Sequence, residues 1–502
     1  MKKTMAALLA LLLLTGCGSN RVPEVTFSET ISLDVAVTET TAPTTEPVPE
    51  TTEPATEATE APVEETESAV LPAVEEIPYE SWFDTVTEIE LSDEGILVDG
   101  GEETDAVFTS WDIIYYNDVH YYESGNRYGE GTEEDWHSAA EAGSHMVVNI
   151  TEPGAYRVTG TLSAGQIRVD LGEDAYEDED AVVELILSDA DITCTVAPAI
   201  LFLNTYECDC NWYEVDPQAE VDTYAAGANL ILEGSNAITG SHVPKIYEDT
   251  EYEEKLWKQD GAIYSYMSMN VFGPGSLELI GDNEGLCTEL HLTINGGDIS
   301  IYSANDGINT NEDGVSVTTI NGGKLTIFAG LGDEGDGIDS NGYLVINGGH
   351  VVAAANPRGD AGLDSDMGSY VNGGTVIAMG STMDWAESDS EQVTMNLQFE
   401  EELEAGSKIT VTKEDGTQIF SFDSDGEYFR DFSGLILSHP AFTLEVTYHV
   451  YVDGEQMGYT GTDLGKGGRG GKRHANEESE EDVMTDFYMN DNVNAFSGVA
   501  IA

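Results

Sequence analysis

The sequence predicts an all-β protein whose core is a parallel β-helix, a solenoid of stacked strands. The triplet Asn-Gly-Gly recurs at 295–297, 321–323, 347–349 and 372–374, at intervals of 26, 26 and 25 residues. Each triplet lies between an apolar residue and a run of alternating apolar residues, which is typical of strands with one buried face. Because leucine-rich and calcium-binding nonapeptide patterns are missing, this period indicates one coil of a β-helix per repeat.

Stacking the repeats in register would align equivalent side chains in columns. Two apolar columns would face the core: Ile299, Leu325, Val351 and Val376, and then Ile301, Ile327, Ala353 and Ala378. The triplet asparagines, Asn295, Asn321, Asn347 and Asn372, would form an amide ladder at a turn. Less regular strands are expected at 182–187, 229–232 and 277–280. Since each coil buries its neighbour, one core can run through the whole β-helix.

The amino-terminal residues predict an exported lipoprotein. Lys2 and Lys3 precede a short apolar run, and Leu14-Thr15-Gly16-Cys17 resembles the lipobox of bacterial lipoproteins, which are cleaved just before the cysteine. We therefore expect residues 1–16 to be a signal peptide and Cys17 to be lipidated. The lipid would anchor the chain to the extracellular face of the cell membrane. A plain secretory signal is the alternative.

Composition divides the rest of the chain. Residues 17–75 contain the lipidated cysteine and a stretch rich in Thr, Glu and Pro, which we expect to be a disordered stalk because it cannot bury apolar surface. The β-helix is expected over residues 86–392, with a β cap over 393–456 that hides its open end. Residues 457–502 are predicted to be a glycine-rich basic segment followed by an acidic tail.

The cysteines leave the disulfides open. Cys208 and Cys210 are too close in sequence for an easy mutual bridge. One disulfide from Cys194 to either of them is possible outside the cell. The spacing does not match a zinc site.

The charge balance restricts the partners. Lys plus Arg number 18 and Asp plus Glu number 96, so the formal net charge is −78. This charge excludes nucleic acid, whose phosphates need the opposite sign, and disfavours anionic lipid headgroups, so membrane contact is expected through the lipid anchor only. Cations, neutral polymers and anions bridged by cations remain as partners. We expect the chain to be a monomer.

A second repeated motif is acidic. The pattern Gly-(Ile/Leu)-(Asn/Asp) recurs at 307–309, 337–339 and 362–364, with further acids beside it. On adjacent coils, two such carboxylates about 4.8 Å apart would repel by ~3.5 kcal/mol at an effective dielectric of 20. We expect Ca²⁺, which takes about six to eight oxygen ligands, to be bound there. The candidate ligands are Asp306, Asn309, Asp333, Asp336, Asp339, Asp360, Asp364 and Asp366. For any single residue, a turn-forming role is the alternative.

These motifs resemble those of a known family. Residues 335–343, followed by Ile346-Asn347-Gly348-Gly349, resemble the signature of bacterial surface carbohydrate-binding domain-containing proteins. The similarity extends over roughly residues 86 to 456. It implies a right-handed parallel β-helix similar in fold to polysaccharide lyases, bound calcium, and affinity for plant cell-wall polysaccharide. Cys287 and the insertions at 206–226 and 243–260 depart from the pattern, so the number of calcium ions and their ligands stay open.

Aromatic residues provide candidate sugar-binding positions, because sugar rings stack on exposed aromatic faces. Tyr302 and Phe328 share the outward column beside the repeat, where a flanking loop could instead cover them. Tyr264 and Trp385 are further candidates.

Three functions fit these features. The first is a non-catalytic surface protein that binds a pectin-like glycan through calcium. The second is a calcium-dependent uronate lyase, for which Arg358 is the candidate base, unless it only pairs with Asp360. The third is an adhesin, suggested by Arg358-Gly359-Asp360. The scarcity of basic residues in the repeat favours binding over catalysis.

Overall fold

The computed structural model describes residues 77–117, 131–209, 216–247, 255–381, 384–424, 426–462 and 483–502. These residues are organised mainly as strands, with a short helix α2 (Ala139–Ala142) and one 3-10 turn (Ala175–Glu177). The all-β prediction is therefore confirmed. The predicted signal peptide, Cys17 and the predicted stalk lie outside the described residues. Within the part of the chain that the structure describes, no helix is long and apolar enough to span a membrane.

Three parallel ladders form the central part, and the chain visits them in turn. The first contains the strands before the Asn-Gly-Gly triplets or their equivalents: β9 (Ala228–Glu233), β14 (Met269–Phe272), β17 (Leu292–Ile294), β20 (Val317–Ile320), β23 (Tyr343–Ile346) and β26 (Gly368–Val371). The second contains the strands after them: β10 (Ser235–Gly240), β15 (Ser276–Gly281), β18 (Asp298–Ser303), β21 (Lys324–Phe328), β24 (His350–Ala354) and β27 (Thr375–Gly380).

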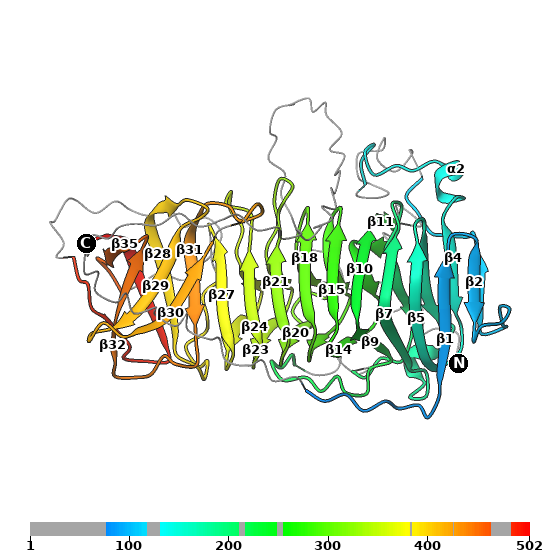
Figure 1. Ribbon diagram of the computed structural model, residues 1–502, viewed down its shortest axis with the longest axis horizontal. Coiled ribbons are helices and arrows are strands. Elements are labelled where there is room, and N and C mark those ends of the chain that lie inside the picture. Colours follow the sequence, from blue (N-terminus) through cyan, green and yellow to red (C-terminus); the bar gives the residue numbers. More distant parts are fainter. Residues whose placement is uncertain are drawn as a thin grey trace, which may run out of the picture. The chain divides into compact units, whose positions relative to one another are not determined.

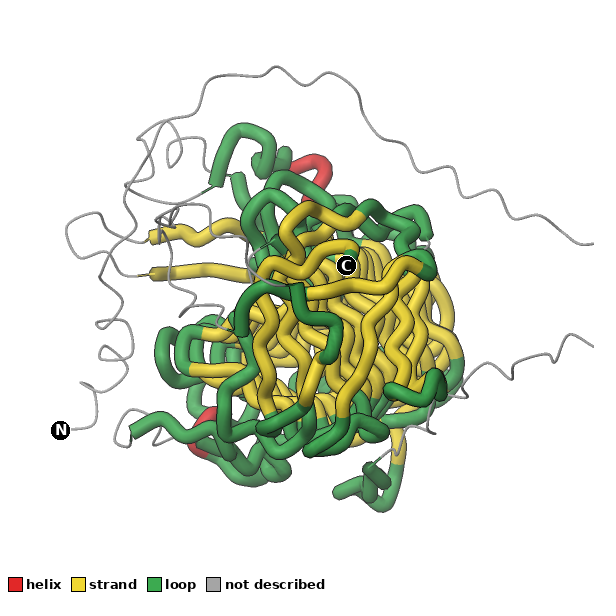
Figure 2. The backbone as a smooth tube through the Cα atoms, turned by 90° about the vertical axis from the view of Figure 1, so that its left-hand side faces the viewer, coloured by secondary structure: helices red, strands yellow, loops and turns green. Residues whose placement is uncertain are grey.

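The third ladder carries the repeated acidic motif. Its strands are β6 (Gly165–Asp170), β8 (Ile200–Asn204), β13 (Gly261–Ser265), β16 (Glu284–Thr288), β19 (Ile308–Thr310), β22 (Ile338–Ser340) and β25 (Leu363–Ser365). Strands of one ladder lie side by side in chain order (Figure 1), and Figure 2 looks along the stacks. Each ladder therefore aligns equivalent residues of successive repeats.

Further strands precede and flank these ladders. On the amino-terminal side they are β1 (Val86–Ser92), β2 (Gly95–Val98), β3 (Val107–Ser110), β4 (Met146–Ile150), β5 (Gly154–Leu162) and β7 (Val183–Thr193). Strand β7 pairs with both β9 and β10, so it spans the first and second ladders. The predicted insertion at 243–260 contains a hairpin of β11 (Val243–Tyr247) and β12 (Lys255–Gln259).

The register confirms the two predicted core columns. Ile299, Leu325, Val351 and Val376 are aligned on adjacent strands, as are Ile301, Ile327, Ala353 and Ala378. All eight side chains are fully buried. Because β strands alternate their side chains, the residues between them face away from this core.

The predicted amide ladder is also present at the triplets. The amide nitrogens of Asn321, Asn347 and Asn372 each donate to the Oδ1 of the asparagine one repeat earlier, across 2.9, 2.9 and 3.0 Å. The second glycine of each triplet has a positive φ, for example +82° at Gly349. A Cβ there would lie 2.8 Å from the carbonyl oxygen of Gly323, so glycine is required by both backbone conformation and close approach.

After β27 most pairings are antiparallel rather than parallel. The following strands are β28 (Thr394–Leu403), β29 (Lys408–Lys413), β30 (Gln418–Asp423), β31 (Phe432–Ser438), β32 (Thr447–Val452), β33 (Glu455–Gly458), β34 (Phe487–Tyr488) and β35 (Val493–Ile501). Strand β31 pairs antiparallel with β27, and β35 pairs parallel with β28. The prediction of a tail over residues 457–502 is wrong for its described parts, because β33, β34 and β35 belong to this C-terminal sheet. Residues 463–482, which carry the basic and acidic runs, lie outside the described residues.

The described cysteines are free thiols. Cys194 and Cys287 are buried, and Cys208 is half-buried. The Cys194–Cys208 disulfide that the sequence allowed is therefore absent. Cys210 lies outside the described residues.

Candidate functional site

The third ladder places the repeated acidic motif in register. Cys287, Asn309, Asp339 and Asp364 are aligned on β16, β19, β22 and β25. Their neighbours Ile308, Ile338 and Leu363 are fully buried in the core, so the aligned polar side chains point to the other face. The motif glycine allows the strands to approach, since a Cβ on Gly337 would lie 2.4 Å from the carbonyl oxygen of Gly362.

The acids just before the Gly-(Ile/Leu) motif form hydrogen bonds with the backbone of neighbouring repeats. The backbone N–H of Asp336 donates to Oδ1 of Asp306 across 2.7 Å, and that of Ala361 donates to Oδ1 of Asp336 across 2.5 Å. The N–H of Gly335 donates to Oδ2 of Asp360 across 3.0 Å. Each carboxylate is therefore held in place by the backbone of the loop in an adjacent repeat.

Glu284 extends this arrangement by one repeat, although it was not among the predicted site residues. Glu284-Gly285-Leu286-Cys287 has the same pattern as Asp306-Gly307-Ile308-Asn309. The Nδ2 of Asn309 donates to Oε1 of Glu284 across 3.1 Å and to Oδ2 of Asp306 across 3.2 Å. Searching for any acid before a Gly-apolar pair would have found this residue. We refer to Glu284, Asp306, Asn309, Asp336, Asp339 and Asp364 as the acid cluster.

Burial and mutual repulsion raise the pKa values within the acid cluster. Desolvation, followed by the charge of Asp306, raises the pKa of Asp336 to about 8. The pKa of Asp339 lies well above its usual range, because the side chain is desolvated and surrounded by the carboxylates of Asp306, Asp336 and Asp364. Desolvation also raises the pKa of Glu284, with further contributions from the charges of Asp260 and Asp306. Without a cation, the cluster therefore retains protons at neutral pH.

Lys258 is the second residue that the repeat pattern could not reveal. It lies on β12, in the insertion rather than in a repeat, and its Nζ is 3.0 Å from Oδ2 of Asp260. The same Nζ donates to Oδ1 of Asn311 across 2.5 Å. Although desolvation opposes it, the charges of Asp260, Glu284 and Glu289 raise the pKa of Lys258. The lysine therefore offsets negative charge at one end of the acid cluster.

The donor set fits a hard cation. All the side-chain groups of the cluster offer oxygen, and Oδ1 of Asn309, a residue only 7% exposed, is buried without a hydrogen-bond partner. In the described residues, no group of three or more His, Cys, Asp or Glu side chains is arranged to hold a metal by itself. A cation here would therefore need amide or backbone oxygens besides the carboxylates, as Ca²⁺ commonly uses.

Three of the predicted site residues are exposed and lie outside the acid cluster. Asp333 and Asp366 are exposed, whereas Asp306 is buried and Asp336, Asp339 and Asp364 are partly buried. Arg358 is also exposed, and its Nη1 lies 3.5 Å from Oδ1 of Asp333. The observed partner of Arg358 is thus Asp333 rather than the expected Asp360. Asp333 lies one repeat earlier, in an exposed loop.

The predicted aromatic candidates are largely covered. Tyr302 and Phe328 stack with ring centroids 5.5 Å apart, but Tyr428 and Phe429, in the loop between β30 and β31, pack on them. The alternative of a covering loop is therefore correct for this pair. The prediction that Tyr264 binds sugar at the surface is wrong, because its side chain is fully buried. Trp385 is partly buried against the core.

A family model described as carbohydrate-binding domain-containing protein matches residues 144–424, more than half of the chain. Among solved structures, the polysaccharide lyase-like protein from C. thermocellum, in its gadolinium derivative, is 21% identical with a TM-score of 0.35. That similarity covers 58% of this chain and 93% of the other. A comparison with curated proteins gave no match. The chain thus belongs to the family of carbohydrate-binding domain-containing proteins, in agreement with its repeated motifs.

Proposed function

We propose that this chain is an extracellular lipoprotein, held at the membrane through Cys17, that binds polysaccharide without cleaving it. In this proposal the three ladders form a right-handed parallel β-helix, and calcium in the acid cluster contributes to glycan binding. The proposed ligand is a plant cell-wall glycan of the pectin type. Its uronate groups can approach so acidic a chain only where a cation bridges the two anions.

The acid cluster is the observation that supports this proposal. The pKa values of Asp336 and Asp339 are raised because both acids are desolvated next to other acids, while Oδ1 of Asn309 lacks a partner. A divalent cation would remove both penalties, because it favours the ionised carboxylates and accepts an amide oxygen as a ligand. The groups that would hold it are Asp306, Asn309, Asp336, Asp339 and Asp364. The bound ion would supply positive charge for a uronate.

Retention on calcium-crosslinked polygalacturonate tests the binding part of the proposal. We expect the chain to be retained in calcium and released by a chelator, and we expect the paired change Asp336→Asn and Asp339→Asn to abolish retention. Asp333→Asn is the matched control, since this exposed acid lies apart from the cluster, and it should behave like the wild type. Calorimetric titration of calcium alone should show binding that the paired variant loses. Retention that ignores both chelator and variant would contradict the calcium-dependent mode.

A calcium-dependent uronate lyase is the competing function, and Lys258 is the residue that would have to act as its base. A lyase needs a base near the bound uronate, and Lys258 is the cation beside Glu284 at the end of the cluster. Its raised pKa keeps the ammonium protonated at neutral pH, which opposes a role as base. Incubation with polygalacturonate and calcium should therefore give no ultraviolet absorbance from unsaturated uronate. Absorbance that Lys258→Met eliminates would establish the lyase and contradict non-catalytic binding.

A further inference from the structure

Two exposed aromatic rings from distant parts of the chain lie together outside the acid cluster. Trp82 precedes the first strand, and Tyr224 belongs to the insertion at 206–226. Their ring centroids are 5.5 Å apart with an interplanar angle of 34°. Trp82 is 43% exposed and Tyr224 is 60% exposed, so both keep a large aromatic surface in contact with solvent.

The backbone at Trp82 is fixed by a buried carboxylate. The N–H of Trp82 donates to Oε1 of Glu184 across 2.7 Å, and the hydroxyl of Ser81 donates to Oε2 across 2.6 Å. Glu184 lies on β7 and is fully buried. Both oxygens of this acid therefore hold the segment that carries the tryptophan.

The backbone at Tyr224 is fixed through the preceding residue. The hydroxyl of Thr223 lies 2.8 Å from Oδ1 of Asn270 and 2.7 Å from Oγ1 of Thr293, and Nδ2 of Asn270 donates to the carbonyl oxygen of Thr223 across 2.8 Å. Glu184, Asn229, Asn270 and Thr293 are aligned along one column of the sheet. Both segments that carry the rings are thus hydrogen-bonded to the same column of the sheet. Ligand binding should therefore cost little conformational entropy in these segments.

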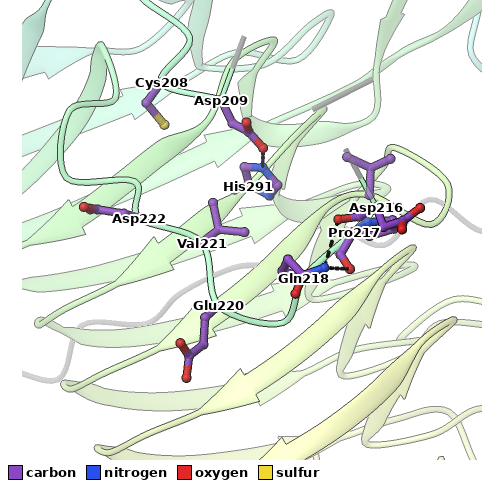
Figure 3. Close-up of a pocket in the computed structure, with 10 residues that line it drawn as sticks. Cys208, Asp209, Asp216, Pro217, Gln218, Glu220, Val221, Asp222 and His291 are labelled. Atoms are coloured by element: carbon purple, nitrogen blue, oxygen red, sulfur yellow. Dashed lines mark hydrogen bonds and ion pairs between the residues drawn. The ribbon is translucent and has the colours of Figure 1, made fainter. Parts of the chain in front are cut away.

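A pocket lined by several acids includes Asp222, two residues before Tyr224. The carboxylate of Asp222 accepts the N–H of Tyr224 across 3.0 Å and also lines a cavity of about 260 Å³. Figure 3 shows the other polar groups around it, which include Asp209, Asp216, Gln218, Glu220 and His291. Since Nδ1 of His291 accepts the N–H of Val317, its Nε2 carries the proton toward Oδ2 of Asp209, 3.3 Å away. The carboxylate and amide oxygens can accept hydrogen bonds from hydroxyls, and the carboxylates repel anions.

We infer that Trp82, Tyr224 and this pocket form a subsite for neutral pyranose sugars that works without calcium. Sugar rings stack their apolar face on aromatic side chains, while carboxylates and amides bind the hydroxyls. The four acids around the pocket exclude a uronate without a cation, so the occupant is a neutral glycan. This subsite adds a second ligand class to the proposed function. It rests only on glycan binding and not on the calcium ion of the acid cluster.

Affinity electrophoresis of the full chain through gels containing hydroxyethyl cellulose, xylan or polygalacturonate tests this subsite in the presence of chelator. We expect a neutral polymer, but not polygalacturonate, to retard the wild type. Trp82→Ala and Tyr224→Ala should each weaken binding roughly tenfold, the effect of losing one stacked ring. Tyr224→Phe keeps the ring and should bind within a few fold of the wild type.

Trp111→Ala is the matched control, because Trp111 is also exposed, at 59%, but lies outside this ring pair. It should leave retardation unchanged, and the melting temperatures of all variants should show that they fold. Equal loss with Trp111→Ala, or neutral-polymer binding that survives the double change at Trp82 and Tyr224, would overturn the assignment. The absence of retardation by every neutral polymer would also overturn it. Because all lanes contain chelator, these outcomes are independent of whether the acid cluster binds calcium.

Discussion

Two polar ladders pass through the same repeats with opposite electrostatic consequences. At the Asn-Gly-Gly turns, each amide of Asn321, Asn347 and Asn372 donates to the asparagine one repeat earlier. On the third ladder, Asp339 and Asp364 are aligned at the same strand spacing, and the pKa of Asp339 is raised well above its usual range. An amide both donates and accepts, so its stack satisfies itself. A carboxylate only accepts, so its stack needs a proton or a cation.

The difference shows that strand spacing alone does not decide whether a stack of aligned side chains stabilises the fold. Register places any residue type in a column, and the chemistry of that residue determines whether the column stabilises the fold or stores repulsion. The amide ladder is therefore complete as it stands, whereas the acid cluster becomes favourable only when charge is supplied. This contrast can be tested at single positions.

The largest expected effect comes from removing a carboxylate from the acid cluster. In metal-free protein at neutral pH, Asp339→Asn should stabilise the fold by roughly 1 to 3 kcal/mol, since it removes a desolvated acid between neighbouring acids. Calcium should stabilise the wild type by about 2.7 kcal/mol at a hundred times its dissociation constant, but should leave the variant unchanged. Denaturant unfolding with calcium or chelator measures both differences.

Asp333→Asn provides the comparison for that experiment. Its side chain is exposed and paired with Arg358, so the change should alter stability by no more than about 0.5 kcal/mol. It should also keep the response to calcium. If Asp339→Asn destabilised the metal-free protein, the view of the cluster as stored repulsion would be wrong.

The next effect is a pH dependence that only the acid cluster should produce. The pKa of Asp336 is raised to about 8 from 3.8, so the folded chain binds this proton more tightly than the unfolded chain. Stability of metal-free protein should therefore fall as pH rises from about 4 to 8, by at most roughly 1.4 kcal/mol per pH unit for this group. Calcium should flatten the slope, because it binds the ionised form.

Comparing Asp336→Asn with the wild type isolates this slope. His242, which lies between Asp135 and Asp282, also loses stabilising protonation as pH rises, and its pKa is raised to about 10 although desolvation opposes the shift. This contribution is common to both proteins and cancels in the difference. Parallel stability profiles for the two proteins between pH 5 and 8 would rule out the proton held by Asp336.

The sequence predicted those features that follow from period and side-chain type. The interval between triplets predicted the core columns, because in-register strands must align residues one repeat apart. The same interval predicted the amide ladder, whereas the separate Gly-(Ile/Leu)-(Asn/Asp) motif placed Asp306, Asp336 and Asp339 together. These predictions needed no information about loops or about the ends of the ladders.

The features that were missed come from segments outside the repeat. Lys258 reaches the cluster from a hairpin, and Tyr428 and Phe429 reach Tyr302 and Phe328 from the loop between β30 and β31. Exposure of Asp333 depends on the course of a loop that the period does not specify. Periodicity thus predicts what lies along a ladder, but not what an insertion places against it.

The smallest expected effect on stability lies in the amide ladder, where an exchange of amide for acid should have the opposite sign to the exchange at Asp339. Asn347→Ala removes one donated and one accepted hydrogen bond at an exposed position, so it should destabilise the fold by about 0.5 to 1 kcal/mol. Asn347→Asp should cost a similar amount, because the carboxylate cannot donate to Asn321. Exchanging amide for acid in this ladder should therefore destabilise, whereas exchanging acid for amide at Asp339 should stabilise. Neither change at Asn347 should depend on calcium, and a calcium-dependent loss measured by denaturant unfolding would show that the two ladders are not independent.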